Sequence, residues 1–170
     1  MPAFMVLLRA VNVGGTGRLP MAELKAMCVA AGFSKVQTYI ASGNVVFETK
    51  TPPQKIKAIL EARLKSYTGE PVGVVMRTLE EMVVVLKSNP FPDAAPNRTH
   101  TIFLDQPPPA SAFDDVKGLK DEELRLGTRE IYVYYPAGMG RSKLKIPTAK
   151  TGTARNMNTV AKLVELAAKL

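Results

Sequence analysis

The order of hydrophobic patterns along residues 3–77 is the feature that most constrains the fold. In sequence, these patterns predict a strand at 3–11, a helix at 20–31, strands at 35–40 and 44–48, a helix at 52–67 and a strand at 72–77. This β-α-β-β-α-β order is typical of the ferredoxin-like arrangement, in which two helices cover one face of a four-stranded antiparallel sheet. The first half of the chain is therefore expected to form such a sheet.

The rest of the chain repeats most of this order. A helix is expected from Thr78, with Glu81 completing a capping box, and the turn-rich residues 90–97 are expected to join the halves. Beyond them the patterns predict strands at 98–105, 123–126 and 130–135, a short helix at 110–116 and a last helix at 154–170, without a clear final strand.

These patterns together predict an α+β protein made of two ferredoxin-like βαββα halves with antiparallel sheets and helices packed on them. The expected halves are residues 1–89 and 98–170, related by a degenerate duplication because they share the order of elements more than the sequence.

Basic residues outnumber acidic ones, and the excess lies mostly at one end. The net charge is +8, and residues 141–170 alone hold seven basic side chains and one acidic. Such a segment attracts polyanions, so we expect nucleic acid or a nucleotide as partner. One cysteine excludes an internal disulfide, and the N-terminal apolar run is too short to span a bilayer. We expect a cytoplasmic chain without a membrane partner, and its oligomeric state stays open.

Four separated motifs resemble one known family. They are LLRAVNVGG, MAELK, TYIASGNVVF and TARNMNTV, and together they run from residue 4 to about residue 165. They are similar to the bacterial family catalogued as domain of unknown function 1697. The resemblance implies a cytosolic α+β protein with duplicated ferredoxin-like halves, and it assigns neither an activity nor a catalytic residue.

The first candidate site is the glycine-rich segment after the first strand. Its glycines allow backbone N–H groups to turn toward a phosphate, and a helix start with its positive dipole end follows. The alternative is a turn whose glycines only satisfy the backbone geometry. The candidate ligand-binding residues here are Arg9, Asn12, Gly14, Gly15 and Arg18.

The second candidate site is the hairpin at Ser42, Gly43 and Asn44. Glycine and asparagine tolerate the positive φ of a tight turn, which is sufficient to explain both residues. The predicted topology places this hairpin and the glycine-rich segment at the same end of the sheet. That adjacency favours a shared binding site.

The third candidate site is the predicted start of the last helix. Thr153 is the expected N-cap, so Arg155, Asn156 and Asn158 would lie in the first turns, where free N–H groups attract anions. The alternative is a capped, solvated helix start. The preceding residues 138–145 form a basic segment of a kind that grips phosphates without reading bases.

The remaining reactive residues favour structural roles. Cys28 lies on the apolar stripe of the first helix, and His100, the one histidine, lies on a strand without a second metal ligand nearby. Neighbouring acids such as Glu122 and Glu123 point apart on a helix and make no acid–base dyad. We expect no metal site and no cofactor.

Three functions remain open from the sequence. The preferred hypothesis is binding of a phosphorylated ligand, either nucleic acid or a nucleotide. The first alternative is a small enzyme for a phosphate-bearing molecule, and an enclosed pocket would favour it over an open basic groove. Its site would combine Arg9, Ser42, Asn44, Arg155 and Asn156. The second alternative is a protein-interaction module, for which an exposed apolar patch near Phe91 or along the tyrosine-bearing strand at 130–135 would be the sign.

Overall fold

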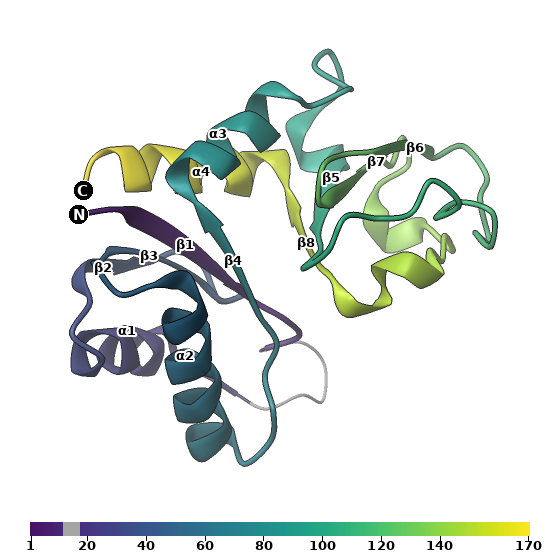
Figure 1. The fold of residues 1–170 in the computed structure, drawn as a ribbon. Helices are drawn as coiled ribbons and strands as arrows, with labels where there is room; N and C mark the ends of the chain where they lie inside the picture. The colour runs from purple at the N-terminus through teal and green to yellow at the C-terminus, as the bar shows by residue number, and fades with distance from the viewer. Residues whose placement is uncertain (12–17) are drawn as a thin grey trace. The chain divides into compact units, whose positions relative to one another are not determined.

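The computed structural model describes residues 1–11 and 18–170. The chain divides into two compact units, one of residues 1–83 and 162–170, the other of residues 84–161. Each unit contains a four-stranded antiparallel sheet (Figure 1). The protein is thus α+β with two sheets, as the order of sequence patterns predicts.

The first sheet has the strand order β2-β3-β1-β4, which is the ferredoxin-like order. Every neighbouring pair of strands in it is antiparallel. The elements of this unit are β1 (Ala3–Leu8), α1 (Met21–Ala30), β2 (Ser34–Thr38), β3 (Asn44–Glu48), α2 (Pro53–Thr68) and β4 (Val74–Thr78).

Helices α1 and α2 cover one face of this sheet and build the larger hydrophobic core with it (Figure 1). Leu24 of α1 and Leu60 of α2 are fully buried there, together with Val6 of β1. The opposite side chains of β1, Met5 and Leu7, are buried as well. A strand buried on both faces carries no polar alternation, which explains the continuous apolar run in the sequence.

The second sheet has the strand order β6-β7-β5-β8, which repeats the order of the first with β5 in the place of β1. The first strand of each half, β1 or β5, pairs with the third and the fourth strand of the same half. This shared topology fits a duplication. Its strands are β5 (Thr99–Phe103), β6 (Glu123–Leu126), β7 (Glu130–Tyr134) and β8 (Thr153–Asn156).

Loops and short 3-10 turns replace both covering helices in the second unit. The helix expected at 110–116 is wrong, because this segment forms successive turns such as Ala112 N–H to Pro109 O and Asp114 N–H to Ser111 O. These bonds join residues three positions apart, so the segment closes separate turns and lacks the four-residue spacing of an α-helix. The 3-10 turns of the chain are η1 (Pro96–Arg98), η2 (Met139–Arg141) and η3 (Pro147–Thr151).

The last strand β8 corrects the prediction for the end of the chain. Residues 153–156 pair with β5, so the sheet takes the backbone groups that the expected helix start would have used. Helix α4 (Met157–Ala168) begins only afterwards. Its cap is Asn156, whose Oδ1 accepts a hydrogen bond from the N–H of Thr159 at 2.9 Å. Thr153 as the N-cap was therefore wrong.

Helix α3 (Leu79–Lys87) follows β4 as α4 follows β8, and it confirms the predicted capping box. The N–H of Glu81 donates to Thr78 Oγ1 at 3.1 Å, and the N–H of Thr78 donates to the Glu81 carboxylate at 2.9 Å.

A buried arginine precedes each of these two capping residues. Arg77 donates from Nη1 to the carbonyl of Met76 at 2.8 Å, and Arg155 donates from Nη1 to that of Ala154 at 2.9 Å. Both guanidinium groups thus bond to the preceding carbonyl at the same place of their half. This equivalence fits a duplication. The sequence patterns of the halves do not indicate it.

The division into compact units differs from the expected boundary at 90–97. The main segment of the first unit ends at Val83, within α3, and the unit also includes residues 162–170, which contain the C-terminal part of α4. The predicted halves describe the repeated order of elements, whereas the compact units describe which residues pack together.

Candidate functional site

The end of β1 and the β2–β3 hairpin are neighbours, as the topology predicts. The N–H of Leu8 donates to the carbonyl of Gly43 at 2.8 Å. A Cβ on Gly43 would lie 2.8 Å from the Val11 side chain. The expected adjacency is confirmed for these described residues. The candidates Asn12, Gly14 and Gly15 lie outside the described residues and stay predictions.

The hairpin residues have structural explanations. Gly43 has a φ of +91°, a conformation that glycine adopts without strain. The buried Asn44 donates from Nδ2 to the carbonyl of Tyr39 at 2.9 Å and to Ser42 Oγ at 3.0 Å, which holds the turn. Arg9 and Arg18 are exposed. The hydrogen bonds of Ser42 and Asn44 described above hold the turn, and Arg9 is the exposed cation that directly follows β1.

Arg155 lies in strand β8 and not in the first turn of a helix. Its guanidinium is buried and donates to Thr153 Oγ1 at 2.7 Å. Burial lowers the pKa of Arg155 to about 10, so the side chain stays charged at neutral pH. Asn156 is used as the helix cap, and Asn158 is exposed on α4. The predicted basic helix start is therefore corrected to a strand with one buried cation.

A pocket with charged residues in its walls lies in the second unit, between two of the loops that replace the helices. Its walls come from residues 118–122, just before β6, and from residues 135–143, just after β7. The cavity has a volume of about 460 Å³. Part of the second wall is the basic segment 138–145 that the sequence singled out for phosphate binding.

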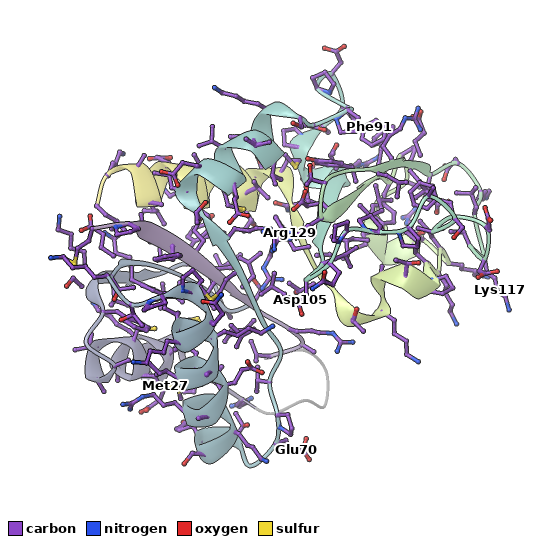
Figure 2. All side chains as sticks on the ribbon, viewed as in Figure 1. Met27, Glu70, Phe91, Asp105, Lys117 and Arg129 are labelled. Atoms are coloured by element: carbon purple, nitrogen blue, oxygen red, sulfur yellow. The ribbon has the colours of Figure 1, made fainter. Side chains whose placement is uncertain are left out.

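The two walls of this pocket are tied together by short backbone contacts. Lys117 and Lys145 exchange both backbone hydrogen bonds, at 3.0 and 2.8 Å. Gly118, with φ +72°, passes so close to Lys143 that an added Cβ would lie 2.1 Å from its carbonyl oxygen. Figure 2 shows Lys117 at the outer end of these loops. The close approach requires glycine and fixes the spacing of the walls.

The lining of the pocket combines three cations with two acids, Asp121 and Glu122. Lys120, Arg141 and Lys143 are the cationic residues. Glu122 accepts hydrogen bonds from Ser142 Oγ at 2.5 Å and from the N–H of Lys120 at 2.8 Å. These bonds, the one from Ser142 first, hold the pKa of Glu122 below its usual value. The carboxylate is therefore ionised at neutral pH.

Tyr135 forms the inner wall of the pocket. Burial, and then the negative charge of Glu122, raise the pKa of its hydroxyl, so the phenol stays protonated at neutral pH. Behind it lies the buried His100, whose ring meets that of Tyr135 edge to face at 5.2 Å. The Nδ1 of His100 has no hydrogen-bond partner among the residues that the structure describes.

Cys28 has the structural role expected of it, and two aromatic residues of the second unit are buried as well. Cys28 is fully buried in the first core, and burial raises the pKa of its thiol to about 12. Tyr132 is buried and donates from its hydroxyl to the carbonyl of Val85 at 3.0 Å. Phe91 is buried against Tyr134, with Arg125 over its ring, so Phe91 itself contributes little exposed apolar surface.

Sequence reasoning missed the first wall of the pocket. Lys120 belongs to no recognisable motif, and Glu122 enters the sequence analysis only as a partner of Glu123 in a possible acid–base dyad. The available signals were the turn residue Gly118 and the run of charged residues at 120–123 that follows it. Neither signal indicates that this segment meets residues 135–143, which follow a different strand.

Metal-ligand clusters and membrane-spanning helices are both absent from the part of the chain that the structure describes. Within residues 1–11 and 18–170, no group of three or more His, Cys, Asp or Glu side chains could hold a metal ion. None of the helices in that part of the chain is long and apolar enough to cross a membrane.

Comparison with known proteins agrees with the fold and is silent on the site. A conserved bacterial protein from Streptococcus pneumoniae, SP0830, has a similar structure, with a TM-score of 0.80 and 24% identity over 98% of each chain. That degree of identity shows the fold alone. No curated protein matches the chain. Residues 1–132 match the family model described as protein of unknown function, DUF1697, and the motif TARNMNTV lies beyond the matched residues. The chain belongs to this family, DUF1697.

Proposed function

We propose that the protein binds a phosphorylated small molecule in the pocket between residues 118–122 and 135–143. The observation that carries the proposal is the convergence of Lys120, Arg141 and Lys143 on one cavity of about 460 Å³. Pockets of about 300–1,000 Å³ are the size that holds small ligands. Cationic side chains make charge-assisted hydrogen bonds to phosphate oxygens, which are among the strongest that proteins form.

The local charge favours an anion although two acids line the pocket. Residues 117–122 and 137–145 hold five basic and two acidic side chains. Glu122 accepts one hydrogen bond from Ser142 of the opposite wall and one from the N–H of Lys120 of its own wall, so part of its charge is already compensated. A bound phosphate would therefore meet a net positive potential.

The shape of the site favours a small ligand over a polymer. A polymer needs an open basic track that follows successive phosphates, whereas this cavity is bounded by two loops that contact each other at Lys117 and Lys145. Among the lining groups, Glu122 has a lowered and Tyr135 a raised pKa, and neither is poised to move protons near neutral pH. We therefore propose binding rather than turnover.

The test is titration calorimetry with inorganic phosphate and with adenosine monophosphate. We expect saturable binding of both, and the variant Arg141→Ala should weaken each by tenfold or more, because a hydrogen bond to a charged group contributes about 1.5–3 kcal/mol. Arg63→Ala is the matched control, since Arg63 is an exposed arginine on α2 of the first unit.

Two results would contradict the proposal. If Arg18→Ala abolished binding and Arg141→Ala left it unchanged, the ligand would sit at the end of the first sheet. If only a single-stranded oligonucleotide bound, with an affinity that fell steeply with salt, the partner would be nucleic acid.

A further inference from the structure

The carboxylate of Glu122 is the unexpected group in a pocket proposed for an anion. A free acid would repel phosphate, yet this one is built into the wall. Its Oε2 accepts from Ser142 at 2.5 Å and its Oε1 accepts from the N–H of Lys120 at 2.8 Å. The Oγ of Ser142 in turn accepts from the N–H of Leu144 at 3.1 Å. These contacts fix both the position and the charge of the carboxylate.

A carboxylate held in this way can still accept hydrogen bonds from a ligand. Its two oxygens offer about four acceptor positions. Ser142 and the N–H of Lys120 occupy two of them, and the backbone N–H groups of Asp121 and Glu122 also contribute to its lowered pKa. Any acceptor position that faces the cavity can take a hydrogen bond only from a donor. Because the walls are tied at Lys117 and Lys145, the backbone segments that carry the cations and the carboxylate are held near each other. A ligand with an anionic end and a hydrogen-bond donor would therefore meet a partner for each group in this pocket.

The donor that fits is a hydroxyl rather than an ammonium group. The five basic side chains in residues 117–122 and 137–145 outnumber the two acidic ones, so the net charge of these segments disfavours an ammonium group. Hydroxyls carry no charge, and a pair on adjacent carbons can bond to both oxygens of one carboxylate, as a ribose does to an acidic residue in dinucleotide-binding folds. The inner wall, Tyr135, adds a protonated hydroxyl that can donate to or accept from such a ligand.

We propose that the pocket takes the phosphate ester of a polyol, such as a sugar phosphate or a nucleoside monophosphate, and that Glu122 recognises its hydroxyls. This inference rests on the proposed function. The cations hold the phosphate, and the carboxylate distinguishes a polyol ester from a simple phosphate.

The experiment compares ribose 5-phosphate with ethyl phosphate, an ester without hydroxyls, by titration calorimetry. In the unaltered protein we expect ribose 5-phosphate to bind at least tenfold more tightly. Glu122→Gln should bring this ratio close to one, and ethyl phosphate should bind equally well or better, because a repulsive charge is removed. Asp93→Asn is the matched control for the change in net charge, since Asp93 is an exposed acid outside the pocket.

A second variant separates recognition from folding. Ser142→Ala removes one of the two bonds that hold the carboxylate and keeps its charge, so it should reduce the preference for ribose 5-phosphate by a smaller factor. The midpoint of urea unfolding, measured for each variant, shows that the fold is intact.

The outcomes distinguish this inference from the proposed function. Equal affinity of the unaltered protein for both esters would overturn the role of Glu122 and leave phosphate binding standing. Tighter binding of phosphoethanolamine than of ribose 5-phosphate would overturn the choice of a hydroxyl over an ammonium group. Failure of all three esters to bind would overturn both proposals.

Discussion

The two halves of the chain share one strand order and differ in what covers the sheet. In the first, α1 and α2 place fully buried side chains such as Leu24 and Leu60 on the sheet. In the second, loops take the same positions between the strands, and half-buried residues such as Phe113 and Leu144 pack on a smaller core around Ile131. The same topology thus supports either a helical layer or a layer of loops.

This difference explains why the pocket proposed for ligand binding lies in the second half. A helix satisfies its own backbone groups and buries an apolar stripe, which leaves its sheet face closed. Loops place backbone groups and charged side chains at irregular positions. Here they enclose the candidate pocket beside Tyr135. Binding residues in proteins concentrate on loops that a rigid scaffold positions, for the same reason.

Truncating one leucine in each covering layer tests this comparison with the largest expected effect. Leu60→Ala should lower the free energy of unfolding by about 2–5 kcal/mol, because the side chain is fully buried and leaves a cavity. Leu144→Ala, in a half-buried loop position, should cost less than about 2 kcal/mol. Urea unfolding measures both values. Equal losses would mean that the loops are packed as tightly as the helices.

Two glycines of the pocket test whether its loops are held in place. Gly118→Ala should cost about 2–4 kcal/mol, because a left-handed φ and a clash with the Lys143 carbonyl add together. Gly138→Ala is the comparison variant, since its surroundings are open and no clash is added; its φ of +88° and ψ of 149° are nearly exclusive to glycine, so strain alone should cost about 1–3 kcal/mol, less than at Gly118. Thermal and urea unfolding give the comparison. If the two values agree, the walls move apart easily and the fixed spacing is wrong.

The helix caps test the equivalence of the halves. Thr78→Ala and Asn156→Ala should each lower the free energy of unfolding by about 1 kcal/mol, because each residue caps the helix that follows the last strand of its half. Urea unfolding under identical conditions measures the two losses. A loss at one cap and none at the other would argue against equivalent roles.

The smallest expected effect is the pH dependence from His100. Burial lowers the pKa of His100 below its usual value of 6.5. The folded state thus binds the proton less well than the unfolded state, so the stability that His100 contributes is complete above pH 6.5 and is lost as the pH falls toward the lowered pKa. His100→Phe keeps a ring against Tyr135, and its stability should fall less between pH 7.5 and 5.5. Urea midpoints across this range supply the measurement, and parallel curves would contradict it.

Local patterns in the sequence were sufficient for most elements of both sheets. The strand at 44–48 agrees with β3 to the residue, and the capping box of Thr78 and Glu81 was predicted in full. Both depend on side chains within a few positions of each other. The likeness of the halves and the closeness of Gly43 to the end of β1 followed from the order of elements, because strand order decides which chain ends meet.

What only the tertiary structure decided depends on contacts between distant segments. Residues 153–156 carry a helix-start pattern, and pairing with β5 makes them a strand because the sheet supplies partners for their backbone groups. The candidate pocket forms where residues 118–122 meet residues 135–143, and Glu122 is placed by Ser142, twenty positions away along the chain. Propensity and periodicity describe neighbours along the chain, whereas a site is made by side chains that folding brings together.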